Sequence, residues 1–189
     1  LFLPATRLRV IETERETVYT RTRKKFDDKP PKSRRKWILW TLMLGSMIAG
    51  LDATIVNVSI PAMMNDFRVP VSQVQWVVSA YMIAFAVLMP LTGWLREQIG
   101  SRKLYLLAIG VFTLGSLLCG LAWNLHALVA FRVLQALGGG AMTPIAMAIL
   151  AETFPASEKG RALGIWGAGV LLGPILGPPL GGFLTEYAG

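Results

Sequence analysis

The chain has 189 residues, of which 53% are hydrophobic and only 16% are charged, and its mean hydropathy is +0.51. This composition is typical of a chain that folds in lipid rather than in water. The single cysteine, Cys119, excludes an internal disulfide framework. Because the chain starts with Leu1 and stops at Gly189 without a tail, we expect it to be a fragment of a longer protein.

The first segment, residues 1–36, is strongly basic and contains twelve of the nineteen Lys and Arg residues. Pro30 and Pro31 break any helix before the basic cluster at residues 32–36. We interpret residues 1–36 as a disordered cytoplasmic tail, because a Lys/Arg cluster beside a spanning helix sets the orientation of that helix. The alternative is a patch that binds anionic lipid or nucleic acid.

Five apolar segments follow the tail, at about residues 37–64, 76–95, 104–123, 125–151 and 162–184. Crossing the hydrocarbon core takes about 20 residues, so each segment is long enough to span a membrane. In lipid, a helix is the only open-chain structure that satisfies the backbone hydrogen bonds. We therefore predict an all-α polytopic membrane protein in which residues 37–189 form five transmembrane helices.

The loops between these segments differ in charge. The loops at residues 95–104 and 152–161, on the same side as the tail, carry five basic residues: Arg96, Arg102, Lys103, Lys159 and Arg161. The opposite loops carry only Arg68 and His126. The positive-inside rule therefore predicts a cytoplasmic N-terminus in a multi-pass protein of the cell membrane, with Gly189 outside. Trp37, Trp76 and Trp123 at segment ends fit interfacial anchors.

Two charged residues lie inside apolar segments, Asp52 in the first and Arg132 in the fourth. A carboxylate in the membrane is costly and usually marks an ion or proton pathway. The alternative for Asp52 is a packing role, with Ser46, Thr54 or another polar neighbour as its partner. Arg132 could instead direct its guanidinium along the helix to the membrane surface.

The two charges are predicted to lie at similar depths in the membrane. Asp52 lies fifteen residues after Trp37, which is about 22 Å at the rise of an α-helix. In a core of about 30 Å, this leaves Asp52 roughly 8 Å from the outer face. Arg132 lies seven residues after Leu125 on a helix that runs inward, about 10 Å from the same face. If the first and fourth helices are neighbours, the two charges can pair.

Four sequence motifs occur in chain order on these segments: 51–61 (LDATIVNVSIP), 93–103 (GWLREQIGSRK), 128–141 (LVAFRVLQALGGGA) and 173–182 (GPILGPPLGG). As a set they closely resemble the first helix, the loop between helices two and three, the fourth helix and the fifth-helix antiporter motif of the drug:proton antiporters with fourteen helices. These transporters, of the EmrB/QacA type, belong to the major facilitator superfamily. The resemblance covers about residues 37–189.

The resemblance implies the N-terminal half of a major-facilitator transporter and assigns roles to three groups of residues. The proton-coupling and substrate group is Asp52, Arg132, Asn57 and Gln135. The gating-loop group is Gly93, Glu97, Gly100, Arg102 and Lys103, with Glu97 in the acidic position and Gln98 where the motif usually has a basic residue. The antiporter-motif group is Gly173, Gly177, Pro178, Gly181 and Gly182.

The glycines of these motifs have physical roles that can be predicted. Gly93 and Gly100 allow a close helix approach and the tight turn of a short loop. Gly173, Gly177 and Gly181 recur every four residues and form a smooth stripe on one helix face, which suits packing against another helix. The prolines of the same segment are expected to bend the helix and to free backbone carbonyls.

An enzymatic function is excluded by the residue inventory. One His, one Cys, no cluster with metal-ligand spacing and no phosphate-binding loop leave no catalytic site to build. The glycine run 138–140 is not followed by Lys and Ser or Thr. We expect no cofactor, no metal and no nucleic-acid partner.

The sequence therefore predicts proton-coupled efflux of amphipathic or cationic small molecules, with the lipid bilayer and protons as further partners. Asp52 is predicted to carry the coupling proton and Arg132 to tune it. Met82, Met89, Met142 and Met147 could offer an adaptable surface to varied substrates, or could fill the core or face lipid. The alternative functions are a uniporter or importer of the same superfamily, and a truncated membrane module that does not transport.

Overall fold

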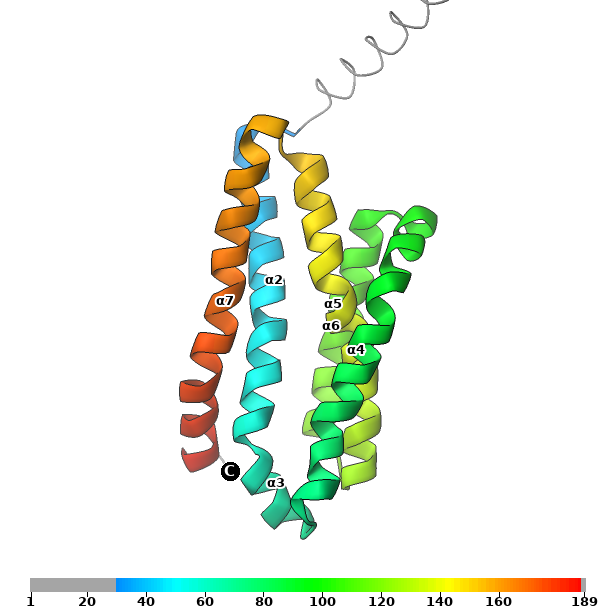
Figure 1. Cartoon of the computed structure of the whole chain (residues 1–189), viewed down its shortest axis with the longest axis vertical. Helices are drawn as coiled ribbons and strands as arrows, with labels where there is room; N and C mark the ends of the chain where they lie inside the picture. The colour runs from blue at the N-terminus through cyan, green and yellow to red at the C-terminus, as the bar shows by residue number, and fades with distance from the viewer. Residues whose placement is uncertain (1–29, 188–189) are drawn as a thin grey trace, which may run out of the picture.

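The computed structural model describes residues 30–187, apart from the side chains of residues 184, 185 and 187, so residues 1–29 of the predicted tail lie outside the described part. The described residues form six helices: α2 (Lys32–Val58), α3 (Ile60–Phe67), α4 (Val71–Ile99), α5 (Ser101–Gly120), α6 (Leu125–Thr153) and α7 (Ala156–Tyr187). All except α3 are long and apolar enough to cross a membrane. The prediction of an all-α protein with five spans is confirmed (Figure 1).

Helix α2 begins five residues earlier than the first apolar segment does. Pro31, with φ −58° and ψ 154°, directly precedes the first helical residue, Lys32. A proline disrupts a helix interior but is tolerated at a helix start, where a backbone N–H has no helical partner. The N–H of Arg35 then donates to the carbonyl of Pro31 at 3.1 Å. The basic cluster at residues 32–36, assigned to the tail from the sequence, therefore forms the first turn of α2.

The first predicted span, residues 37–64, is wrong at its C-terminal end. Helix α2 stops at Val58, and the short helix α3 starts at Ile60. Pro61 explains the break, because it has no N–H to donate and its ring clashes with the preceding helical turn. Helix α3 ends at Phe67, and the next residue, Arg68, has a φ of 51° that places it in the left-handed region just before Val69 and Pro70.

The connections at the other end of the bundle are shorter than the predicted loops. Gly100 alone separates α4 from α5, and its φ of 85° is a conformation that side chains disfavour. This confirms the predicted role of Gly100 in a tight turn. Phe154 and Pro155 alone separate α6 from α7. The residues predicted to form loops here are mostly the ends of helices.

The long helices form two groups, α2 with α7 and α4 with α5 and α6 (Figure 1). Glycines set the close contacts inside each group. A Cβ added to Gly115 of α5 would lie 2.6 Å from the Cα of Gln135 on α6, and one added to Gly140 of α6 would lie 2.8 Å from the carbonyl oxygen of Phe85 on α4. Such distances are too short for any side chain, so these helices meet backbone to backbone.

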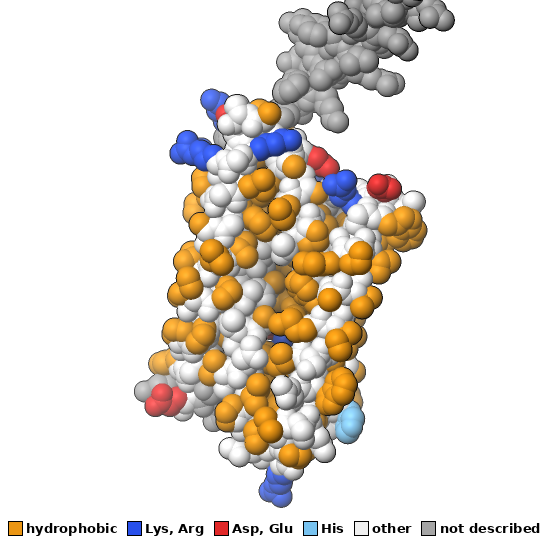
Figure 2. Space-filling view, viewed as in Figure 1, with side chains coloured by type: hydrophobic (Ala, Val, Ile, Leu, Met, Phe, Trp, Pro, Cys, Tyr) orange, Lys and Arg blue, Asp and Glu red, His pale blue; other side chains and the backbone are white. Residues whose placement is uncertain are grey.

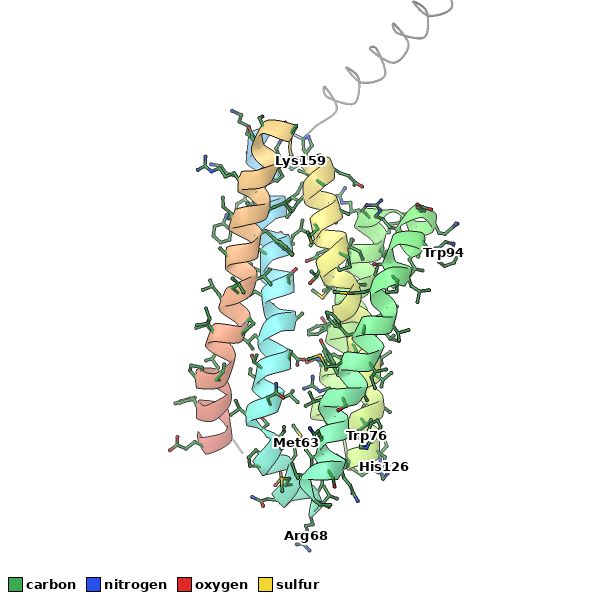
Figure 3. All side chains as sticks on the ribbon, viewed as in Figure 1. Met63, Arg68, Trp76, Trp94, His126 and Lys159 are labelled. Atoms are coloured by element: carbon green, nitrogen blue, oxygen red, sulfur yellow. The ribbon has the colours of Figure 1, made fainter. Side chains whose placement is uncertain are left out.

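Most of the Lys and Arg residues that the structure describes lie at one end of the bundle, which we call the basic end. Here α2, α5 and α7 begin and α4 and α6 end, and Figure 2 shows the blue side chains gathered there. Figure 3 shows Lys159 and Trp94 at the basic end, and Arg68, Trp76 and His126 at the opposite end. The unequal charge predicted between the loops is therefore present as an asymmetry between the two ends of the described structure.

Two apolar clusters fill the space between the helices. The larger one, here the basic-end cluster, joins α2 to α5, α6 and α7 and includes Met43, Ala49, Phe112, Met142 and Trp166. The smaller one, here the far cluster, joins α2 to α4 and α6 through Val56, Val77, Leu125 and Leu128. On both α2 and α6, a short stretch separates the residues of one cluster from those of the other.

Candidate functional site

The stretch between the two apolar clusters contains a polar group of three side chains from α2 and α6. The guanidinium of Arg132 donates from Nη1 to Oδ2 of Asp52 at 2.7 Å. The amide Nε2 of Gln135 donates to the other carboxylate oxygen, Oδ1, at 3.0 Å. Both oxygens of Asp52 are therefore bonded by side chains of α6. The conditional prediction that Asp52 and Arg132 can pair is confirmed as a contact.

Burial makes this contact unlike an ion pair on a protein surface. The side chain of Arg132 is 7% exposed and that of Asp52 is 19% exposed, while Gln135 is fully buried. Charges removed from water need both a partner and further hydrogen bonds to offset the lost hydration. Gln135 supplies the extra hydrogen bond to Asp52. The Nε of Arg132, in contrast, is buried without a hydrogen-bond partner.

An aromatic ring completes the surroundings of Arg132. The guanidinium carbon lies 5.7 Å from the ring centroid of Tyr81 on α4, a distance at which the ring attracts a cation. Tyr81 itself is 4% exposed. Tyr81 could not be predicted from the sequence, because it lies in an uncharged apolar segment without a motif. Helix α4 therefore contributes to the site beside α2 and α6.

The apolar clusters enclose the polar group along the bundle. On α2, Ala49 belongs to the basic-end cluster and Val56 to the far cluster, with Asp52 between them. On α6, Leu128 and Ala141 take the corresponding places around Arg132 and Gln135. The three polar side chains thus form one thin layer between two apolar layers. A site of this kind strengthens electrostatic interactions, because little water surrounds the charges.

Neither Ser46 nor Thr54, the two residues named as packing partners, forms a hydrogen bond with Asp52. Thr54 donates its hydroxyl to the backbone carbonyls of Gly50 and Leu51 rather than to Asp52. The hydroxyl of Ser46 is buried without a partner. Arg132 points to Asp52 and not toward the membrane surface. The pair is therefore formed between α2 and α6 and is not satisfied within either helix.

Asn57 lies apart from this group. Its side chain is exposed, and its Nδ2 donates to the carbonyl of Ala53 one helical turn earlier at 3.1 Å. Within the described part of the chain, it forms no hydrogen bond with Asp52, Arg132 or Gln135. Of the four residues predicted for proton coupling and substrate, the structure brings three together and leaves Asn57 separate.

The gating-loop residues lie around the turn between α4 and α5. Glu97 is exposed and forms no ion pair with another described residue. The acidic side chain in contact with this turn is Glu152 at the end of α6, since Arg96 lies 3.8 Å from it and the hydroxyl of Ser101 donates to it at 3.3 Å. Arg102 and Lys103 are exposed at the start of α5. Glu152 could not be predicted as a partner of this turn, because it lies 55 residues after Glu97 in the sequence.

Gly93 does not have its predicted role among the described residues. A Cβ added there would meet nothing within 4 Å, so no neighbouring helix approaches it closely. The same holds for Gly182 at the far end of α7. These two positions differ from Gly100, where the positive φ itself requires glycine.

The predicted glycine stripe of the fifth span is confirmed as a packing face. A Cβ on Gly173 would lie 2.9 Å from the N of Leu51, one on Gly177 would lie 2.7 Å from the Cβ of Thr54, and one on Gly181 would lie 3.3 Å from the Cβ of Val58. All three neighbours are on α2. Helix α7 continues through Pro174, Pro178 and Pro179 as one helix.

The methionines divide between the two predicted environments. Met142 is 2% exposed and belongs to the basic-end cluster, so it fills the core. Met82, Met89 and Met147 are exposed at 43–48%. These three remain available as a surface for either lipid or substrate.

Comparison with known proteins identifies the family. A family model described as "Major Facilitator Superfamily" matches residues 42–189, most of the chain. The matched range begins inside α2 and includes the polar layer and all later helices.

Several curated relatives are similar over about four fifths of the chain. The chain is 39% identical over 157 residues to "Riboflavin transporter RibZ" of Clostridioides difficile, which covers 82% of the chain and 34% of that relative. It is 39% identical to "Putative multidrug resistance protein MdtD" of Salmonella heidelberg, over 81% of the chain and 33% of that relative. It is 37% identical to "Multidrug export protein EmrB" of Haemophilus influenzae, over 83% and 31%. The chain thus spans about a third of the length of these relatives.

A solved structure has the same arrangement of helices. It is that of a bacterial homologue of the human lysosomal transporter Spinster, in an inward-facing and unoccupied conformation. The TM-score is 0.71 at 26% sequence identity, and the match covers 82% of this chain and 33% of that one.

Proposed function

The chain belongs to the Major Facilitator Superfamily, and we propose on that premise that it takes part in proton-driven export of amphipathic or cationic small molecules. The observation that carries this proposal is the carboxylate of Asp52, bonded by Arg132 and Gln135 in a polar layer between two apolar clusters. A membrane-embedded carboxylate with a single cationic partner can exchange that partner for a proton. The names of two similar proteins, a multidrug export protein and a multidrug resistance protein, support the class of substrate.

The mechanism follows from what a proton does to the contact between α2 and α6. The ionised carboxylate of Asp52 attracts Arg132, which keeps the two helices together at this level. A proton on Asp52 removes the charge, and the hydrogen bond of 2.7 Å between Arg132 and Asp52 loses most of its strength. The two helix groups can then move relative to each other. Alternating access would couple this change to the side of the membrane that the carboxylate faces.

A cationic substrate can act on the same group. Its positive charge would compete with the guanidinium and with the proton for the carboxylate of Asp52. Binding of substrate and of proton would then exclude each other, which makes exchange obligatory. The residues expected to act are Asp52 as the proton carrier, Arg132 as its electrostatic partner, and Gln135 and Tyr81 as the side chains that position them.

The test is drug-induced proton release from the purified transporter in detergent. Asp52→Asn keeps the shape of the side chain and an oxygen that can accept from Arg132, so we expect normal folding and no drug-induced release. The matched control is Asp66→Asn, which removes an exposed carboxylate from α3 and should leave the release unchanged. Equal release from the Asp52 variant and from wild type would mean that the coupling proton binds to a residue other than Asp52.

One observation favours a second candidate function. A similar protein is named a riboflavin transporter, so the chain could serve the transport of one defined solute rather than of many drugs. Uptake or efflux of riboflavin and of a lipophilic cation, measured in the same cells, separates the two functions. Transport of riboflavin alone would replace the drug-export proposal.

We also propose that the basic end faces the cytoplasm. Nine of the eleven Lys and Arg residues among residues 30–187 lie there, and cytoplasmic loops carry an excess of these residues. A reporter inserted before Pro30 should be inaccessible from outside intact cells. Labelling of that reporter by an impermeant reagent would mean that the basic end faces the outside of the cell.

A further inference from the structure

A cleft of about 410 Å³ opens at the basic end between the starts of α2 and α7. Its rim carries four basic side chains, Lys32, Arg35 and Lys36 from α2 and Arg161 from α7, against one acidic side chain, Glu158. The cleft lies far from the Asp52 layer, and none of its residues belongs to the polar layer, the gating-loop group or the antiporter-motif group. Figure 2 shows this end as the most basic part of the visible surface.

The charges of the cleft are only partly balanced. Arg35 lies 3.4 Å from Glu158, and its Nε donates to the carbonyl of Pro30 at 2.7 Å. Lys32, Lys36 and Arg161 form no ion pair with another described residue. Helix α2 also has no acidic residue in its first turn. Cations at the start of a helix repel the positive end of its dipole, so an anion in the cleft would relieve two unfavourable interactions.

The floor of the cleft is apolar. Leu39 and Phe154 are buried there, and Ile165 lies beside them with 42% exposure. A binding site for a free anion is usually polar on all sides, because a charge is costly next to apolar groups. A cationic rim above an apolar floor suits a molecule with a charged head and an apolar body.

A second, shallower groove of about 700 Å³ starts from the same lysines. Lys32 and Lys36 line both hollows, and the second groove continues along α2 past Trp40 to Leu44. Trp37 is 74% exposed and Trp40 is 53% exposed on this groove. Exposed tryptophans mark the level at which the headgroups of a membrane meet the hydrocarbon. The two hollows therefore lie at the depth where a lipid headgroup continues into its acyl chain.

We propose that the cleft between the starts of α2 and α7 binds the phosphate headgroup of an anionic membrane lipid, with an acyl chain in the groove along Trp40 and Leu44. Lys36 and Arg161 contact the phosphate from opposite helices. The lipid joins α2 to α7 at the membrane surface, above the glycine contacts that join them deeper in the membrane. This proposal does not depend on proton coupling or on drug export.

The test is lipid retention by the purified transporter, measured by native mass spectrometry with added phosphatidylglycerol. The double variant Lys36→Gln/Arg161→Gln should weaken binding by roughly 30-fold, since each Lys or Arg near an anionic surface contributes about a fivefold effect. The matched control is Arg34→Gln/Lys159→Gln, which removes the same charges from the same two helices outside the cleft lining. The control should bind phosphatidylglycerol as wild type does.

Two further measurements identify the occupant. Phosphatidylcholine, which has a phosphate but no net charge, should be retained far more weakly by the wild type. Inorganic phosphate at the same concentration should not displace phosphatidylglycerol, because it lacks the acyl chain that occupies the groove. The charge-preserving variant Lys36→Arg/Arg161→Lys should restore binding and so excludes misfolding as the cause of a loss.

The proposal is overturned by any of three results. The cleft variant could retain phosphatidylglycerol as the wild type does, or the control could lose it equally, which would indicate a general surface attraction. Displacement by inorganic phosphate alone would assign the cleft to a free anion.

Discussion

Helix α2 meets its neighbours in two opposite ways. Toward α7 the contact is made by glycines, such as Gly173 and Gly177, whose Cα atoms lie directly against the backbone and side chains of α2. Toward α6 at the level of Asp52 the contact is made by three polar side chains. A backbone contact has no second arrangement at similar energy, because packed interiors are not continuously deformable. A charge pair does have a second arrangement at similar energy, because a single proton on the carboxylate weakens its attraction to the guanidinium.

The contact between α5 and α6 resembles that between α2 and α7. Gly115 lies against the backbone of Gln135, and Gly138 lies against that of Phe112. The chain therefore consists of two tightly packed helix groups with a polar layer in the interface between them. We infer that the groups act as units in transport, and that the interface at Asp52 is where their relation changes.

The largest effect is expected from removing the cation of the polar layer. Arg132→Met keeps most of the volume but leaves the carboxylate of Asp52 without its partner, which costs about 3–5 kcal/mol when the carboxylate is ionised. A protonated carboxyl needs no cation, so the loss in the free energy of unfolding should shrink as the pH falls. Thermal unfolding in detergent between acidic and neutral pH measures this difference.

A second variant shows whether the charge or the packing is responsible. Asp52→Asn combined with Arg132→Met contains no buried charge at this level and should recover most of the stability. In the double variant the pH dependence should also disappear. A single variant as stable as wild type at every pH would mean that the pair contributes nothing to the contact of α2 with α6.

A smaller effect is expected at the glycine interface. Gly181→Leu introduces a side chain where a Cβ already lies 3.3 Å from Val58, and overpacking of this kind costs about 1–3 kcal/mol. Gly164→Leu on the same helix is the control, because a Cβ there meets nothing within 4 Å. Unfolding and efflux of both variants are measured side by side. Equal stability of the two would mean that α7 does not pack on α2 through this face.

The smallest effect is expected from the aromatic partner of Arg132. Tyr81→Leu removes the ring that lies 5.7 Å from the guanidinium and should cost about 1–2 kcal/mol, the value of a desolvated cation–π contact. Tyr81→Phe keeps the ring and should lose much less. The difference between the two variants in the pH dependence of efflux reports whether the ring acts through Arg132. No difference would assign Tyr81 to packing alone.

The fold could be predicted from the sequence to a large extent. Length and apolarity specify five spanning helices, because lipid allows no other open-chain structure. The ends of the helices were less predictable. Pro61 breaks the first span, yet Pro90 and Pro144 lie inside continuous helices. Whether a proline ends a helix depends on whether neighbouring groups satisfy the freed carbonyl, which is a tertiary property.

The polar layer was only partly predictable. Asp52 and Arg132 stand out because charges are rare inside apolar segments, and equal depth suggested that they could meet. Tyr81 and Glu152 could not be found, because their roles come from helices whose neighbours the sequence does not specify. The motif groups Asn57 with the site, but its side chain is exposed and bonds the carbonyl of Ala53 one turn earlier on α2. A sequence motif does not specify in which direction around the helix each of its side chains points.

The pairing of α2 with α7 has a consequence for how the protein is made. These helices are in contact, yet 97 residues lie between Val58, the end of α2, and Ala156, the start of α7. At about 5–20 residues per second, a ribosome needs roughly 5–20 s to synthesise that interval. During this time α2 is in the membrane without the helix that its Gly50 face contacts, and by its end α4, α5 and α6 have one another. We therefore expect α4, α5 and α6 to pack together first. Helix α2 gains its last neighbour only when α7 has been synthesised.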